Sequence, residues 1–220
     1  MPALIAAGPA YRGEGLFMLG LFLSTVVLVG PAWCSHLCYI GAWDDAMARA
    51  KRRPGFRRND GLRALLALIV IGGAIVLRLA GAGWLLATVL AAAFGLAGVA
   101  VMLIASRRRG VMVHCTVYCP VGLLANLLGK LSPWRVRIDP SGCTECMACA
   151  RVCRFNALDL SDIRAGKPAY TCTLCTDCLT SCPQNTMRLS FPGLSPAIAH
   201  DAFTALVVVL HVTFLGVARI

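Results

Sequence analysis

The sequence CTECMACARVC at residues 143–153 recurs 29 residues later as CTLCTDCLTSC at residues 172–182. Each stretch holds four cysteines in the spacing C-x2-C-x2-C-x3-C. A [4Fe–4S] cubane takes one thiolate on each of its four irons, and in paired runs of this kind the fourth cysteine binds the other cluster. A lone C-x2-C would also suit zinc or a redox dithiol. Two complete runs therefore indicate two [4Fe–4S] clusters.

The crossing of the fourth cysteines decides the ligand sets. We assign the first cluster to Cys143, Cys146, Cys149 and Cys182, and the second to Cys172, Cys175, Cys178 and Cys153. This crossing ties together the halves of a small α+β domain of the bacterial 2[4Fe–4S] ferredoxin type, which we place at residues 138–192. Pro183 follows the second run, whereas Arg154 follows the first. We interpret Arg154 as a solvated side chain; the alternative is a cation that raises the potential of the cluster bound through Cys153.

Local structure inside this domain is expected to be short. Residues 155–158 are expected to form a helix after the first run. Residues 169–170 and 187–189 are expected to form two strands, with Tyr170 packed on a cluster.

The rest of the 220-residue chain is strongly apolar. Hydrophobic residues make up 58% of the sequence, and the mean hydropathy is +0.74, whereas soluble domains are about 45–50% apolar. A helix needs about 20 apolar residues to cross a bilayer. The sequence therefore predicts a four-helix transmembrane bundle, with spans at about residues 16–33, 62–80, 84–105 and 202–218.

These spans divide the chain into a membrane module (residues 1–137), the inserted ferredoxin domain and a C-terminal transmembrane segment (residues 193–220). The first span ends in Trp33-Cys34 rather than in small residues, which favours a span over a cleaved signal peptide. Arg63 and Arg78 lie near the ends of the second span, where long side chains can snorkel to the interface. Gly81 to Gly83 form a tight turn that makes the second and third spans a hairpin.

Basic residues predict the orientation. The net charge is +11, and the arginines and lysines gather between the first two spans and after the third, including Arg49, Lys51, Arg52, Arg53, Arg57, Arg58, Arg107, Arg108 and Arg109. By the positive-inside rule the ferredoxin domain faces the cytoplasm and both termini face outside the inner membrane. Nucleic-acid binding would need a basic face on a soluble fold, which the sequence does not indicate. The tight grouping of all twelve cysteines favours metal sites in a reducing compartment over disulfides.

Two further cysteine pairs have the spacing C-x3-C and lie near the ends of spans. Cys34 and Cys38 close the first span, and Cys115 and Cys119 follow the third. On a helix, residues i and i+4 share a face, so each pair can offer two thiolates in one direction. Together the pairs supply the four thiolates of a third Fe–S cluster. The alternatives are a redox-active or structural disulfide, and free or loosely metal-binding thiols.

Three other features of the sequence bear on the fold and the sites. Residues 121–131 are too short to span a bilayer and are predicted to form an interfacial helix anchored by Trp134. Residues 44–45 are predicted to cap a short helix that carries the basic run. His200 and His211 share a helix face and could ligate haem, but each iron would need a second axial ligand from elsewhere. We therefore expect polar contacts between helices or at the interface instead.

The order of these elements resembles that of the ferredoxin-type membrane proteins of the NapH/MauN kind, whose elements recur in the NosR and CcoG polyferredoxin proteins. The resemblance covers residues 16–218. The second pair matches the C-x3-C-P pattern through Pro120, whereas the first has Tyr39 in that place. The resemblance implies electron transfer between the quinone pool and a partner redox protein, or maturation of such a protein.

Nothing in the sequence indicates a substrate pocket, a nucleotide loop or a flavin site. We therefore expect an electron-transfer subunit rather than a self-contained enzyme, with the lipid bilayer, redox partner subunits and quinone as its partners. The alternative functions are an assembly factor that reduces a metal or disulfide for a respiratory enzyme, and a membrane-bound redox sensor.

Overall fold

The computed structural model describes residues 3–13, 16–51 and 60–218 of the chain. Its helices are α1 (Ala3–Arg12), α2 (Leu16–Val29), α3 (Tyr39–Ala48), α4 (Asp60–Leu79), α5 (Trp84–Ala100), α6 (Arg107–Arg109), α7 (Pro120–Leu128), α8 (Ala148–Val152), α9 (Leu160–Arg164), α10 (Asp177–Thr180) and α11 (Pro196–Ala218). Its strands are β1 (Arg135–Ile138) and β2 (Met187–Ser190). A 3-10 turn at Gly30–Ala32 and π-helical turns at Trp33–Leu37, Val101–Ser106 and His114–Tyr118 extend or join the helices.

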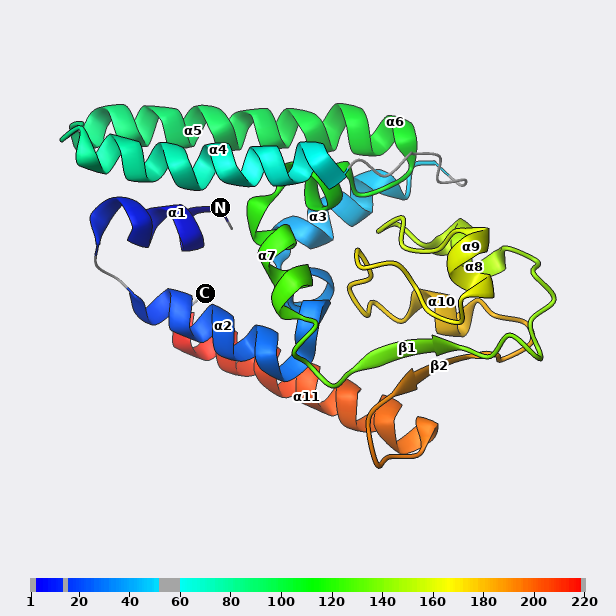
Figure 1. Ribbon diagram of the computed structural model, residues 1–220. Coiled ribbons are helices and arrows are strands. Elements are labelled where there is room, and N and C mark those ends of the chain that lie inside the picture. Colours follow the sequence, from blue (N-terminus) through cyan, green and yellow to red (C-terminus); the bar gives the residue numbers. More distant parts are fainter. Residues whose placement is uncertain (1–2, 14–15, 52–59, 219–220) are drawn as a thin grey trace.

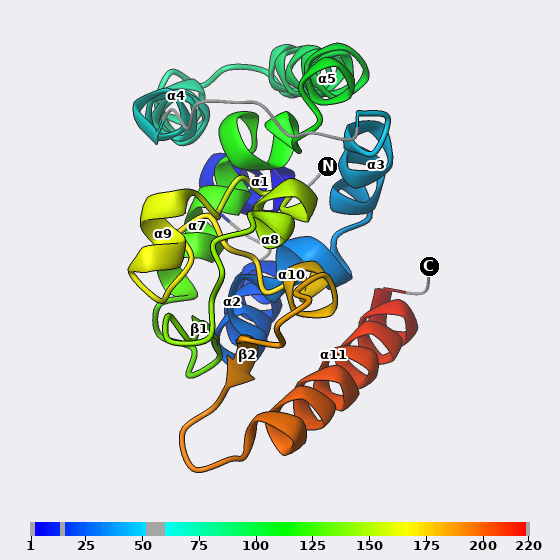
Figure 2. The same ribbon diagram turned by 90° about the vertical axis from the view of Figure 1, so that its right-hand side faces the viewer.

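Four helical stretches of the described chain are long and apolar enough to cross a membrane. They are Leu19–Leu37, Gly61–Leu79, Trp84–Arg109 and Pro196–Thr213. This confirms the expectation of four long apolar helices. All four reach the cysteine-rich module at one end, with α4 and α5 on one side and α2 and α11 on the other (Figure 1). The view from the module end shows that α4 and α5 stand apart although a turn at Gly81 joins them (Figure 2).

Helix α1 was not predicted from the sequence. It packs beside α4, and the hydroxyl of Tyr11 donates a hydrogen bond to the carbonyl oxygen of Ala82, 2.7 Å away in the turn before α5. The contact fixes α1 against the turn of the α4–α5 pair. Ten residues are too few to span a bilayer, and hydropathy therefore did not single the helix out.

Helix α7 overlaps the predicted interfacial helix at residues 121–131, but it lies inside the protein. Val121, Gly122 and Ala125 are buried, and α7 contacts α4, α2 and the 3-10 turn. The predicted surface position is therefore wrong. Trp134 is also buried, and its indole N–H donates to the carbonyl oxygen of Leu28 at 3.0 Å, so it fastens the module to α2.

The cysteine-rich module contains a two-stranded antiparallel sheet. Strand β1 pairs with β2 through the partners Val136 and Leu189. The prediction of a strand at residues 169–170 is wrong, because these residues precede and enter a turn. The predicted helix at residues 155–158 is wrong as well. Short helices flank it instead, and α9 begins at a capping box in which Asp159 and Asp162 each accept a backbone N–H.

The module and the long helices share one apolar core. Val136, Leu174 and Leu189 of the module belong to the same buried cluster as Val29 of α2 and Phe203 of α11. Sheet and helices therefore bury each other's apolar faces, and the module is not a separate lobe.

Arg154 joins the module to the helix ends. Its guanidinium donates hydrogen bonds to the carbonyl oxygens of Lys51 at 2.8 Å and Gly110 at 2.9 Å. Its own carbonyl accepts the N–H of Met112 at 2.9 Å. The interpretation of Arg154 as a solvated side chain is therefore wrong. Pro183 follows the second run, whereas the residue that follows the first run, Arg154, holds the segments at Lys51 and Gly110 by hydrogen bonds.

Replacing Arg154 by Ala should loosen this junction. Two hydrogen bonds from a charged donor are lost, each worth about 1.5–3 kcal/mol at most. We expect faster amide hydrogen exchange at Met112 and its neighbours, measured by mass spectrometry on the protein in detergent. Arg151→Ala removes an exposed arginine of the same run and serves as the control. Equal exchange in both variants would contradict the assigned role.

Candidate functional site

Two cavities in the module are lined by the two cysteine sets. The first is lined by Cys143, Cys146, Cys149 and Cys182. The second is lined by Cys153, Cys172, Cys175 and Cys178. The structure thus groups the eight cysteines as the sequence assigned them, the crossing of Cys153 and Cys182 included.

The loops around the cavities adopt a strained backbone that repeats between the two runs. Six residues other than glycine have left-handed φ angles of 50–66°, namely Glu145, Met147, Asn156, Leu174, Thr176 and Asn185. They fall at matching positions of the two runs. Such conformations cost of order 1–3 kcal/mol each and persist where the surrounding structure requires them. Alternating right- and left-handed residues turn successive N–H groups into one concavity, which suits an anionic group.

Burial keeps the unliganded thiols of the second cavity protonated. It raises the pKa of Cys153, Cys172 and Cys175 to about 12. Because metals bind thiolates, loading must displace these protons. In the part of the chain that the structure describes, no three His, Cys, Asp or Glu residues converge on a single-ion site. A cubane distributes its thiolates over four irons, so its ligands need not converge on one point.

The other four cysteines lie close together, at the π-helical turns Trp33–Leu37 and His114–Tyr118. Each of the four thiols lies within electrostatic range of the other three, and none forms a disulfide. We call this set, Cys34, Cys38, Cys115 and Cys119, the membrane quartet. The structure therefore brings together the two pairs that are far apart in the sequence.

Each pair of the membrane quartet sits on a π-helical turn rather than on an α-helix. The N–H of Cys38 donates to the carbonyl of Trp33 at 3.0 Å, and the N–H of Cys119 donates to that of His114 at 2.8 Å. The i, i+4 geometry assumed from the sequence is thus replaced by a wider turn. π-Helical turns of this kind are frequent at functional sites.

A glycine three residues after each second cysteine completes the repeat. A Cβ atom on Gly41 would collide with the carbonyl oxygen of Cys34. A Cβ atom on Gly122 would lie 2.8 Å from the carbonyl oxygen of Cys115. The motif is therefore C-x3-C-x2-G in both places, a signal in the sequence that the prediction missed.

Two charged side chains that were expected elsewhere lie beside the membrane quartet. Arg63 is 2% exposed and donates from Nη2 to the carbonyl oxygen of Cys115 at 3.3 Å, so the expectation that it snorkels is wrong. Asp44 is fully buried inside α3, where its carboxylate accepts the N–H of Cys115 at 3.0 Å. It is therefore not a helix cap. Burial raises the pKa of Asp44 to about 6.

The second cavity adjoins the membrane quartet directly. The hydroxyl of Ser35 donates to the carbonyl oxygen of Thr173 at 2.8 Å, and Nε2 of His36 lies 3.2 Å from that of Leu174. Cys175 packs against the buried cluster that contains Cys115. The residues between Cys34 and Cys38 of the membrane quartet thus contact the residues between Cys172 and Cys175 of the second cavity.

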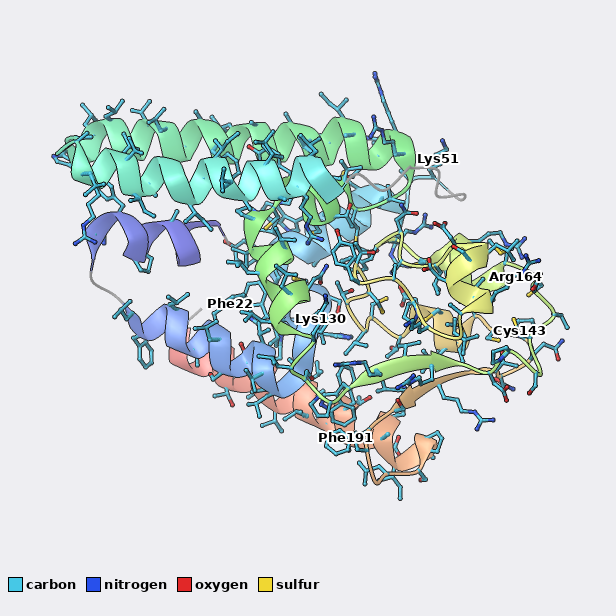
Figure 3. All side chains as sticks on the ribbon, in the orientation of Figure 1. Phe22, Lys51, Lys130, Cys143, Arg164 and Phe191 are labelled. Atoms are coloured by element: carbon cyan, nitrogen blue, oxygen red, sulfur yellow. The ribbon has the colours of Figure 1, made fainter. Side chains whose placement is uncertain are left out.

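The first cavity lies further out. Cys143 is at the end of the module away from the long helices (Figure 3), and Cys146 is exposed. Phe155 rather than Tyr170 lines the second cavity. His200 and His211 lie on the exposed surface of α11, away from the cysteine sets.

Comparisons with known proteins agree with this arrangement. Two models described as 4Fe-4S binding domains match the chain, one at residues 12–57 and 77–139 and the other at residues 136–159. The putative electron transport protein YccM of Escherichia coli is 33% identical over 40% of this chain and 24% of its own length. The methylamine utilization ferredoxin-type protein MauN of Methylorubrum extorquens is 27% identical over 70% of this chain and 56% of its own.

The chain spans between about a quarter and just over half of the length of these relatives. No solved structure matches it. The matched models include both the membrane quartet and the first cysteine run of the module. The chain thus carries 4Fe-4S binding domains and belongs to the ferredoxin-type polyferredoxin family.

Proposed function

We propose that this protein is a membrane-bound electron-transfer subunit with a [4Fe–4S] cluster in each module cavity and a third Fe–S cluster in the membrane quartet. Each bound cluster would supply one-electron redox chemistry. The observation that carries the proposal is the direct contact between the second cavity and the membrane quartet, through Ser35 and His36. Three cysteine sets in contiguous order are what a relay requires.

The residues of the module fit the clusters. Each cavity presents four cysteines from two separate segments. Left-handed residues recur at matching positions of the two loops, and such a backbone can turn N–H groups toward cluster sulfides. Apolar residues such as Ile138 and Leu158 line the cavities and limit the access of water. A dry lining of this kind helps to set the reduction potential.

The long helices support membrane insertion. Large apolar side chains such as Leu68, Val76, Leu85 and Leu96 are exposed on α4 and α5, and a soluble monomer rarely exposes so extensive an apolar surface. Arg107 to Arg109 lie at the module end of α5. By the positive-inside rule, we place the module in the cytoplasm and both termini outside the inner membrane.

The order of the sites suggests where the partners bind. Exposed Cys146 brings the first cavity to the surface of the module, where a soluble redox partner can approach. The membrane quartet lies among the long helices, where the partner would be quinone or a membrane subunit. Electrons would pass between these two ends, and the chain would act as a subunit of a larger oxidoreductase.

Iron content tests the number of clusters. Protein purified without oxygen should contain about twelve irons and twelve acid-labile sulfides per chain, and Cys115→Ser should reduce both to about eight. The matched control is Thr116→Val, which changes the residue next to Cys115 and removes no thiol. This variant should retain about twelve irons and twelve sulfides per chain. About eight irons in the unmodified protein, unchanged by Cys115→Ser, would leave the quartet without a cluster.

Protease accessibility tests the orientation. Arg164 and Arg151 are exposed on the module, so trypsin should cleave there in inside-out membrane vesicles and not in intact spheroplasts. Cleavage in spheroplasts would place the module outside the cell. Membrane insertion would be contradicted if carbonate washing released the protein into the supernatant and trypsin cleaved it in both preparations.

Acid should release the module clusters. The pKa of Cys153, Cys172 and Cys175 is raised from 9.0 to about 12, so every released thiolate takes up a proton at any pH below about 9. Cluster affinity should therefore fall as pH falls, because the cysteine thiolates and the released sulfides all take up protons. Visible absorbance against pH, in the presence of an iron chelator, measures it. A loss that is independent of pH between 6 and 8 would contradict the expectation.

A further inference from the structure

Arg63 is the least explained buried group beside the membrane quartet. It begins the second turn of α4, yet its side chain turns inward and is 2% exposed. Nη2 donates to the carbonyl oxygen of Cys115, while Nε and Nη1 have no hydrogen-bond partner. A Cβ atom on Gly122 would lie 2.8 Å from Nη2. The fold thus leaves space on α7 for a guanidinium that it does not fully satisfy.

No carboxylate whose side chain the structure describes compensates this charge. Among the residues that the structure describes, Arg63 forms no ion pair with Asp or Glu. Asp44, the other charged group beside the quartet, instead accepts the N–H of Cys115. The groups within electrostatic range of Arg63 are the thiols of Cys34 and Cys119. The cation therefore faces the quartet.

The contents of the quartet decide whether this charge is balanced. Protonated thiols or disulfides are neutral and would leave a buried cation uncompensated, which is strongly unfavourable. Four thiolates around a [4Fe–4S] core carry a net negative charge, which grows by one unit on reduction. Compared with protonated thiols or a disulfide, the cluster gives Arg63 an anionic partner, and its reduced form is the better one.

We propose that Arg63 is the counter-cation of the quartet cluster and raises its reduction potential above that of the same cluster without the guanidinium. The inference rests on the proposed third cluster. In the step concerned, one electron leaves a reduced cluster of the module and enters the quartet cluster, so the donor is oxidised and the acceptor reduced by one electron. No proton moves in this step.

Three variants of the full chain test the proposal, namely Arg63→Met, Arg63→Lys and Arg78→Met. Each is purified without oxygen, assayed for iron, and titrated by EPR through the signal that Cys115→Ser abolishes. Arg78 is exposed at the other end of α4, so Arg78→Met makes the same change on the same helix away from the quartet. We expect Arg63→Met to shift the midpoint potential of this signal downward, Arg63→Lys to restore most of the shift, and Arg78→Met to leave it unchanged.

An unchanged or raised midpoint in Arg63→Met would overturn the proposal. If the EPR signal is absent from Arg63→Met, the iron content of the variants tests the proposal instead. About eight irons in Arg63→Met with about twelve in Arg63→Lys supports a charge requirement, whereas equal loss in both variants overturns it. If no signal of the unmodified protein depends on Cys115, the third cluster itself fails, and that outcome is separate from any result at Arg63.

Discussion

The arrangement of the whole protein depends on the contact between the segment that carries Cys34 and Cys38 and the loop that begins at Cys172. Two hydrogen bonds, from Ser35 to Thr173 and between His36 and Leu174, hold these segments together. The contact places a site built on helix ends against a site built on loops. The module also packs on α2 and α11 through a shared apolar core. Arg154 then holds the opposite side of the junction.

The interior beside the membrane quartet is polar in a way that apolar helices usually avoid. Arg63 and Asp44 are both buried, and they approach different parts of the Cys115 backbone, its carbonyl and its N–H. Charged groups in such surroundings are expensive and mark functional positions. The quartet thus has a cation on α4 and a carboxyl on α3 as neighbours, which makes its electrostatic surroundings asymmetric.

Much of the candidate site could be predicted from the sequence because its signals are local. The spacing of eight cysteines gave the two module sets, and hydropathy gave the four long helices. Features that depend on tertiary packing were missed. Whether Arg63 points to lipid or to the interior depends on the gap at Gly122, and no periodicity encodes that gap. Strand β2 pairs with β1, and the Ile138–Met187 pair joins residues that are 49 apart in the sequence. A long-range pairing of this kind leaves no local pattern. Arg154 was judged by its position in the motif, whereas its role comes from the carbonyls of Lys51 and Gly110.

The repeated C-x3-C-x2-G turns have a consequence for how the membrane quartet is assembled. Each turn follows a long apolar helix and leads into a short one, first α3 and then α7. Each supplies half of the thiols, and neither holds a complete set. The two like turns bring their thiols together within a single polypeptide. The site consequently exists only when both halves have docked, so its formation reports on the assembly of the entire helical framework.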